Sequence, residues 1–168
     1  MNHLDLIVGN LCSLLAMGSN AISSTRKTVK GVLAMQNVSQ VIYCFSAIVL
    51  KGYSAAVQNA VSFFRNLAAI WNIRSKALEW VLVAAAAVLG VTFNNRGLLG
   101  LLPVVGNLQY TLAIFRLKGK ERLLKISFLL SLVAFVIFNF AIGNYVGMIC
   151  DSVVIVTTIV VLIRDRKK

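Results

Sequence analysis

Seven stretches of mainly apolar residues follow one another along the 168-residue chain, separated by short polar gaps. As an α-helix, each stretch would be about 26–30 Å long, which matches the hydrocarbon core of a bilayer. No stretch shows the sustained period-two alternation that a transmembrane β-strand requires. The pattern therefore predicts an all-α membrane protein with seven transmembrane helices, over residues 6–24, 32–50, 54–72, 77–93, 98–115, 123–142 and 145–163.

The composition agrees with this prediction. Hydrophobic residues make up 59% of the chain, charged residues 13%, and the mean hydropathy is +0.85. A soluble domain of this length could not keep so much apolar surface from water, whereas a bilayer removes the need. The gaps are too short to hold a further folded unit, so we expect one transmembrane domain over residues 1–168.

Basic residues lie almost entirely in every second gap. Only Lys51 and Arg96 lie in the alternate gaps, and Arg65 lies inside a predicted helix. Because basic loops are retained in the cytoplasm, the N-terminus is expected outside and the C-terminus inside. The other 14 of the 17 basic residues are Arg26, Lys27, Lys30, Arg74, Lys76, Arg116, Lys118, Lys120, Arg122, Lys125, Arg164, Arg166, Lys167 and Lys168.

This topology accounts for the net charge of +12. Nucleic-acid binding is the competing explanation for so basic a chain, but no motif of interleaved aromatic and basic residues accompanies the charge. A basic cytoplasmic rim in contact with anionic lipid suffices. The predicted partners are therefore the lipid bilayer and not nucleic acid.

The first five residues are not basic and no small-residue cleavage site follows the first apolar stretch, so we expect no signal peptide and a retained first helix.

Motifs for enzyme chemistry are not found. The three cysteines, Cys12, Cys44 and Cys150, fall in apolar stretches and are interpreted as small buried hydrophobic residues. His3 is the only histidine. We expect no enzyme activity, no cofactor and no metal site.

An offset of 92 residues aligns the first three predicted helices with the last three. Tyr53 then falls on Tyr145 and Asn59 on Asp151. Both triplets begin on the same side of the membrane, so they form a parallel repeat: repeat one 6–76, a linker helix 77–94 and repeat two 97–168. This 3+1+3 arrangement resembles the SWEET, PQ-loop and KDEL-receptor group. That resemblance implies a solute site between two three-helix bundles, although the chain has a single proline, Pro103, where SWEET-type repeats carry one each.

The second half of the chain carries a further resemblance, to the YgjV-type family of bacterial inner-membrane proteins. That family has an acidic residue where Asp151 stands and an asparagine where Asn139 stands. The resemblance implies a small protein of the bacterial inner membrane and names no substrate. It rests on Leu101-Leu102-Pro103-Val104-Val105-Gly106, Arg116-Leu117-Lys118-Gly119, Asn139-Phe140, Gly143, Gly147 and Asp151, and more loosely on Arg65-Asn66-Leu67 and Arg74.

Polar side chains inside the predicted helices recur at helical spacing, so we expect them to form stripes facing the bundle interior. Asp151 is short and lies well inside its helix, where an unpaired carboxylate is costly. We therefore predict that it serves a solute or a proton, with Arg65, Asn59 or a cationic ligand as its partner. The predicted solute-binding residues are Tyr43, Asn59, Arg65, Phe135, Asn139 and Asp151, with Asn20, Gln40, Gln58 and Asn107 as a secondary polar lining.

Other interpretations of the same residues stay open. Asn and Gln in membrane helices often only join neighbouring helices, and this is the alternative for Asn10, Asn20, Asn66 and Asn107. The long side chain of Arg65 could reach the interface instead of the interior. The predicted function is transport of a small polar solute by alternating access between the repeats. The alternative is a membrane receptor or scaffold that does not transport. The oligomeric state stays open, a homo-oligomer included.

Overall fold

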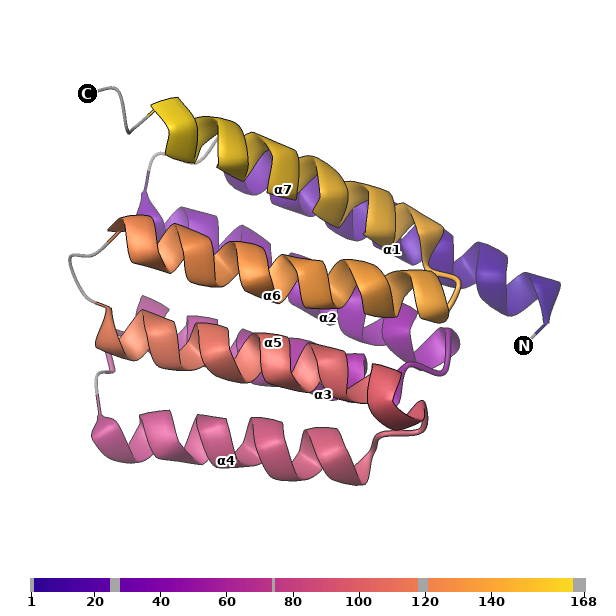
Figure 1. Cartoon of the computed structure of the whole chain (residues 1–168), viewed down its shortest axis with the longest axis horizontal. Helices are drawn as coiled ribbons and strands as arrows, with labels where there is room; N and C mark the ends of the chain where they lie inside the picture. Colours follow the sequence, from indigo (N-terminus) through magenta and orange to yellow (C-terminus); the bar gives the residue numbers. More distant parts are fainter. Residues whose placement is uncertain (1, 25–27, 74, 118–120, 165–168) are drawn as a thin grey trace.

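The computed structural model describes residues 2–24, 28–73, 75–117 and 121–164. Within these residues the chain is all-α, with no strand (Figure 1). The helix bounds lie within three residues of the predicted ones, so the all-helical prediction is confirmed. The seven helices are α1 (His3–Ser24), α2 (Val29–Val49), α3 (Tyr53–Ile70), α4 (Lys76–Thr92), α5 (Gly97–Arg116), α6 (Glu121–Ala141) and α7 (Tyr145–Arg164).

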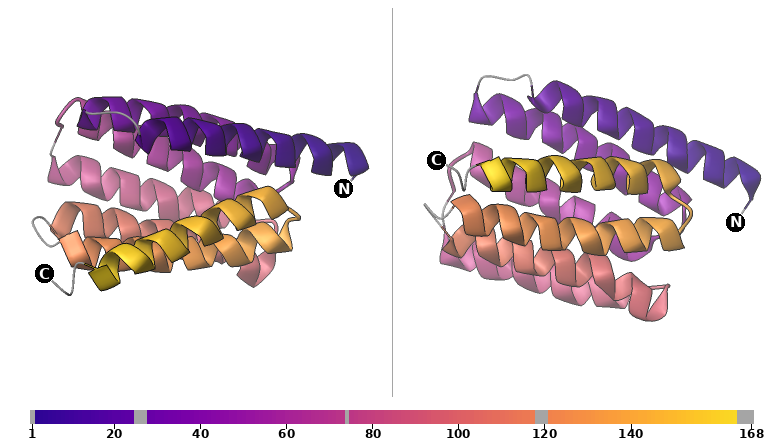
Figure 2. Two further views of the ribbon diagram at one scale, coloured as in Figure 1. Left: turned by 90° about the horizontal axis from the view of Figure 1, so that it is seen from above. Right: turned by 45° about the horizontal axis from the view of Figure 1, so that its top comes forward.

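Six of the helices form a closed ring. Going round it, α1 packs on α2, α2 on α3, α3 on α5, α5 on α6, α6 on α7, and α7 on α1. Figure 2 shows α1 and α2 on one side of the bundle and α6 and α7 on the other. The backbones of α2 and α6 do not pack directly, which leaves space in the middle of the ring. The remaining helix, α4, lies outside and packs against α3 and α5 alone.

Side chains in the structure are distributed inside out relative to a soluble protein. Polar residues such as Ser13, Gln58, Asn107 and Thr111 are buried. Large apolar side chains are exposed on every one of the described helices. Because only lipid makes such an exterior favourable, the distribution indicates a membrane protein. Examples of these exposed residues, in the order α1 to α7, are Leu15, Val41, Phe64, Val88, Val105, Leu130 and Val156.

Three helices are long and apolar enough to cross a membrane, by length and composition. They cover residues Gly97–Arg116, Arg122–Ala141 and Tyr145–Arg164, and a shorter apolar helix covers Leu33–Val49. α4 is apolar but has only 17 residues, whereas α1, α2 and α3 carry more polar residues. In α3 several of these, Gln58, Ser62 and Arg65 among them, are buried in the bundle. Polarity that faces other helices lowers the hydropathy of a span without exposing polar groups to lipid.

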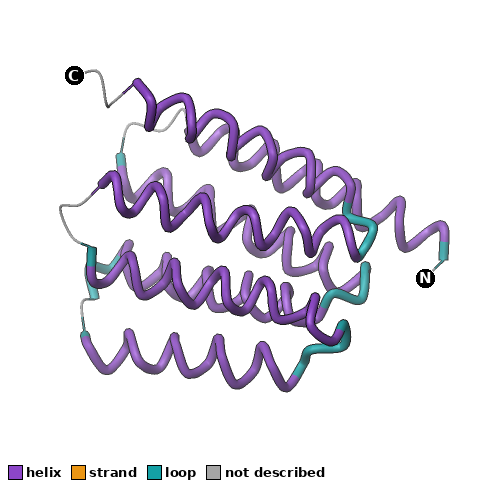
Figure 3. Tube along the Cα trace, viewed as in Figure 1, coloured by secondary structure: helices purple, strands orange, loops and turns teal. Residues whose placement is uncertain are grey.

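Short connections join the helices at the two ends of the bundle (Figure 3). Among the described basic residues, Lys51 and Arg96 lie at the end where α1 begins. Arg116, Arg122 and Arg164 lie at the opposite end, where α5 and α7 end and α6 begins. The two ends therefore differ in basic residues, as the sequence pattern predicts.

Hydrogen bonds between helices close the ring. Asn10 of α1 donates to the carbonyl oxygen of Gly143 at 3.0 Å and accepts from the backbone nitrogen of Val146 at 3.0 Å. On the opposite wall, Gln109 of α5 and Ser127 of α6 exchange two hydrogen bonds, of 2.6 and 2.7 Å. Asn10 thus joins α1 to the start of α7, which is the structural alternative that the sequence left open for it.

The α2–α3 and α6–α7 turns are built alike at an offset of 92 residues. The bounds of α2 shifted by this offset are those of α6. Lys51 and Gly143 both have a positive φ, of 55° and 77°. In each turn the following backbone nitrogen bonds five residues back, Gly52 to Ala47 at 2.7 Å and Asn144 to Asn139 at 2.8 Å. This is the Schellman ending of a helix, where glycine fits best because it lacks a Cβ.

Candidate functional site

The ring of helices encloses a cavity with a volume of about 570 Å³. We call it the central cavity. Its size falls within the range of roughly 300–1,000 Å³ that is common for small-molecule sites. All six helices of the ring contribute to its wall, and α4 contributes none of the residues. Polar side chains line it from Asn144 near one end of the bundle to Gln36 in the second turn of α2 near the other.

The six predicted solute-binding residues meet in this cavity. Nine of the ten predicted site residues line its wall. Tyr43 comes from α2, Asn59 and Arg65 from α3, Phe135 and Asn139 from α6, and Asp151 from α7; Asn20, Gln40 and Asn107 of the secondary set also line it. Gln58 is the exception, because it is fully buried behind the wall. Its predicted place in the lining was wrong, and its structural role is described below.

Arg65 is held inside the bundle and does not reach the interface. Its side chain is buried, with 8% of the residue exposed. The Nη1 atom donates to Asn107 Oδ1 at 3.0 Å and to Thr111 Oγ1 at 3.1 Å. The guanidinium also lies over the Tyr110 ring, 5.2 Å from its centroid. Since these partners all belong to α5, the side chain crosses from α3 toward its neighbour, and the interfacial alternative is excluded for this structure.

Asn107 is the centre of the network around Arg65. Its Oδ1 accepts from Ser62 Oγ at 3.2 Å as well as from Arg65. Its Nδ2 donates to Gln58 Oε1 at 2.9 Å, and Gln58 Nε2 in turn donates to the Ala86 carbonyl of α4 at 2.9 Å. The network therefore joins α3, α4 and α5. Gln58 supports the cavity wall from behind, because each polar group in this low-dielectric region requires a partner.

Asp151 stands at the other side of the central cavity, with an amide partner. Asn139 Nδ2 donates to Asp151 Oδ2 at 2.9 Å, and Asn144 Nδ2 donates to Asn139 Oδ1 at 3.2 Å. Asn144 Oδ1 accepts from the Gly147 backbone nitrogen at the first turn of α7. A chain of three amides and a carboxylate thus fixes Asp151. Among the described residues, the hydrogen-bond partner of Asp151 is Asn139. The prediction that Arg65 or Asn59 is its partner was therefore wrong.

Arg65 and Asp151 do not pair with each other. An ion pair joins Arg116 and Glu79 at 3.6 Å, at the basic end of the bundle, and none joins Arg65 to Asp151. The cavity therefore holds an arginine and an aspartate that each face it without an ion-pair partner among the described residues. Burying unpaired charges is costly, so a structural role alone does not explain this arrangement.

An apolar cluster closes the central cavity at the Lys51 end. It consists of Ala47, Leu50, Ala55, Ala56, Phe138 and Ile142, with Leu50, Phe138 and Ile142 almost fully buried. Ala47 and Ala55 face the central cavity, while Ile142 faces a second cavity of about 520 Å³ at the end of the bundle. We call the second one the end cavity. The apolar cluster therefore separates two cavities.

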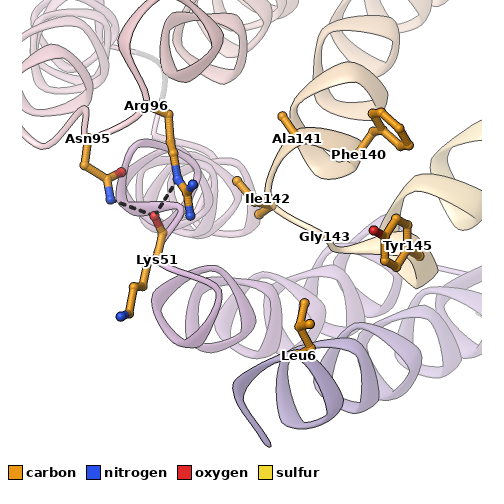
Figure 4. A pocket seen from close by; sticks show the side chains of 9 residues that line it. All are labelled: Leu6, Lys51, Asn95, Arg96, Phe140, Ala141, Ile142, Gly143 and Tyr145. Carbon is orange, nitrogen blue, oxygen red and sulfur yellow. Dashed lines mark hydrogen bonds between the residues drawn. The ribbon is translucent and has the colours of Figure 1, made fainter. Parts of the chain in front are cut away.

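The end cavity lies between three turns and the start of α1 (Figure 4). In this view the side chains of Asn95 and Arg96 point toward the Lys51 carbonyl, while the Lys51 amine points away. Asn95 Nδ2 donates to that carbonyl at 2.8 Å, and Arg96 Nη2 donates to the Leu50 carbonyl at 3.3 Å. A cation at the carbonyl end of α2 is favourable. The hydrogen bonds of Arg96 to these carbonyl groups explain why a basic residue lies at this end of the bundle.

A family model described as a bacterial inner membrane protein, Imp-YgjV, matches residues 7–168. The chain belongs to this family. The resemblance read from residues in the second half is therefore confirmed, and it extends over almost the whole chain. Neither a curated protein nor a solved structure matches the chain. For this member of the inner-membrane family, the geometry of the cavity is the main guide to function.

Some residues of the site were missed in the sequence. Tyr110 and Thr111 follow Asn107 by one helical turn and so share a face of α5, but this spacing alone does not reveal that they hold Arg65. Asn144 follows Gly143 in the gap between two predicted helices, yet it is buried and donates to Asn139. The Gly-Asn pair is a helix-ending signal, but its second residue gains its role only when α6 and α7 are packed.

Proposed function

We propose that this protein is a transporter-like protein of the inner membrane, which moves a small polar solute through the central cavity. The observation that carries the proposal is a polar cavity with an unpaired arginine and aspartate inside a bundle whose exterior is apolar. Polar groups in the membrane are expensive, so they are retained where they serve a solute path. The ring, whose six helices all line the cavity, fits such a path.

The proposal includes seven transmembrane helices in two parallel repeats, α1–α3 and α5–α7, joined by α4. Three observations support it. The helices of each triplet pack in chain order, the α2–α3 and α6–α7 turns share one hydrogen-bond pattern at the 92-residue offset, and Leu50 and Ile142 are equivalent buried residues at that offset. Rocking of one triplet against the other is the alternating-access motion that such repeats permit.

Labelling from outside the cell tests the orientation of these helices. In a protein whose native cysteines are replaced, Lys51→Cys is expected to react with an impermeant thiol reagent, because Lys51 is exposed at the proposed outer end. Ser75→Cys, exposed at the start of α4, is expected to react only after the cells are permeabilised. The reverse result, with Ser75→Cys labelled in sealed cells, would show that the orientation is inverted.

The apolar cluster is proposed as the outer gate of the central cavity. Phe138→Ala removes a fully buried ring from it, a change that costs about 3–5 kcal/mol in a packed core. A cysteine at Asn59, inside the cavity, is therefore expected to react faster with reagent added outside when Phe138→Ala is present. The matched control is Phe45→Ala, because the Phe45 ring is exposed on α2. Equal rates in all three proteins would contradict a gate at this position.

Metabolite profiling tests transport itself. Sealed membrane vesicles with the protein, without it and with Asp151→Asn are incubated in a metabolite extract, and their contents are compared. A solute that accumulates only with the unchanged protein supports transport. A solute that binds the purified protein and does not enter vesicles favours the receptor alternative. If no solute binds or enters, a scaffold that uses the basic rim to hold a partner replaces the proposal.

A further inference from the structure

We infer that the solute is a small zwitterion, with an ammonium group and a carboxylate in one molecule, as in a neutral α-amino acid. The inference rests on the proposed solute-binding function of the central cavity and adds the chemical class of the solute. Arg65 would hold the carboxylate and Asp151 the ammonium group. Both side chains have free hydrogen-bonding capacity, and they form no ion pair with each other.

The free capacity of Arg65 lies along one edge of its guanidinium. Nη1 is occupied by Asn107 and Thr111, and the face of the group is covered by Tyr110. Nε is buried and has no partner among the described residues, and Nη2 donates to none of them. Together, Nε and Nη2 form the fork that matches the two oxygens of a carboxylate. A buried donor without a partner calls for an explanation, and a ligand supplies one.

The surroundings of this guanidinium fix its direction. Asn107, which accepts from Nη1, is itself held by Ser62 and Gln58. None of the residues that bond or stack on Arg65 is acidic, so its charge is solvated by dipoles and a ring without being neutralised. A cation that is oriented by neutral groups, and that lines a cavity, is suited to bind an anion that enters it.

Asp151 likewise has free hydrogen-bonding capacity, as an acceptor. Asn139 occupies Oδ2, while Oδ1 accepts from no group in the described part of the chain. The Tyr43 hydroxyl, which interacts with Asn20, lies within electrostatic range of this carboxylate. These neighbours are neutral amides and a phenol, so the negative charge is not matched by any cation of the described residues. An ammonium group of a solute would provide both the charge and the donor.

The two charges line one cavity and form no ion pair with each other. A pair that served only to neutralise buried charge would be expected in contact, since removing either charge from water is costly unless the two are close. Separated charges of opposite sign instead favour a ligand that carries the opposite charge at each end. The aromatic rings of Tyr43, Tyr110 and Phe135 in the wall offer an apolar surface to the side chain of the solute.

Matched ligand series test the inference on the purified full chain in lipid nanodiscs. The probes are phenylalanine, 2-phenylethylamine and 3-phenylpropanoate, and alanine, ethylamine and propanoate. Binding is measured by calorimetry in the nanodiscs, and competition for uptake is measured in sealed vesicles. The zwitterion of at least one series is expected to bind about 10- to 100-fold more tightly than its amine or its acid, because each lacks one charge-assisted hydrogen bond. Equal binding of the acid and the zwitterion would overturn the role of Asp151, and with it the inference.

Variants assign each end of the solute. Asp151→Asn is expected to bind the zwitterion no better than the acid, and Arg65→Gln no better than the amine. Arg65→Lys keeps the charge without the fork and is expected to lose most of the affinity. The controls Asp5→Asn and Arg164→Gln remove the same charges away from the cavity and are expected to bind as the unchanged protein does. Thermal unfolding in detergent identifies any variant that fails to fold, and the ligand series on the unchanged protein is then decisive.

Failure of the inference and failure of the proposed function give different results. If vesicles accumulate an uncharged or singly charged solute while neither zwitterion series binds, the inference is wrong and transport stands. If the zwitterions bind and never enter vesicles, the solute class is right and the transport proposal is wrong. If nothing in the extract or in either series binds, both are wrong.

Discussion

Asp151→Asn is expected to leave the protein folded and to reduce uptake of its solute by at least about tenfold, the loss of one charge-assisted interaction. The substituted amide keeps the shape of the carboxylate and can still accept from Asn139 Nδ2, so the amide chain from Asn144 survives. Only the negative charge and its attraction for a cationic group are lost. The measurement is the initial rate of uptake into vesicles, at several pH values, with Ser152→Ala of the same helix as the control.

A structural role for Asp151 predicts a different result. If the carboxylate only balanced Arg65, Asp151→Asn would lower the temperature of unfolding and Arg65→Gln would restore it. The structure has no contact between the two, so we expect their effects on the free energy of unfolding to be additive within about 0.5 kcal/mol. Unchanged uptake by Asp151→Asn at every pH would refute the functional role.

The helices and the polar stripes could be predicted from the sequence because both depend on local patterns. Hydrophobic length fixes a transmembrane helix, and spacing along it fixes which residues share a face. Tyr43, Asn59, Phe135 and Asp151 were therefore expected to face the interior, and they line the central cavity. The offset of 92 residues could also be found in the sequence, and it relates two turns that share one hydrogen-bond pattern.

Partners across helices could not be predicted in the same way. Gln58, Ser62 and Arg65 lie along neighbouring faces of α3, and only the packing of α3 on both α4 and α5 directs Gln58 away from the cavity and Arg65 toward it. The two neighbours of α3 differ in polarity, since α4 offers a backbone carbonyl and α5 offers Asn107 and Thr111. Which side chain of α3 faces which neighbour depends on how α4 and α5 pack around α3, and no local sequence pattern contains this information.

The same limit applies to Asp151. Its predicted depth follows from its position along α7, but its partner Asn139 is one of several polar residues at similar expected depth. The two helices meet at the α6–α7 turn, so a local connection decides the pairing. Arg65 was considered because it is the only cation at comparable depth in a predicted helix. Charge alone was a poor guide, since the hydrogen-bond partners of both groups are neutral side chains.

A large loss of stability is expected for Asn107→Leu. The leucine fills a similar space and offers no hydrogen bond, so Arg65 Nη1 keeps only Thr111, and Gln58 Oε1 loses its donor. Each buried group left unpaired costs about 1–3 kcal/mol, and a charged group more, so we expect a loss of about 3 kcal/mol in the free energy of unfolding. Asn66→Leu is the control, because Asn66 lines the same cavity without a hydrogen bond to another described side chain.

A second substitution should reverse part of this loss. Arg65→Met added to Asn107→Leu removes the unpaired guanidinium, and an apolar replacement of a complete buried polar group is often close to neutral. The double variant is therefore expected to unfold at a higher temperature than Asn107→Leu alone, although it lacks the cation that the solute site requires. Unfolding of Asn107→Leu at the temperature of the unchanged protein would mean that Asn107 does not hold Arg65 in place. In that case the guanidinium would not have the fixed direction on which a carboxylate site depends.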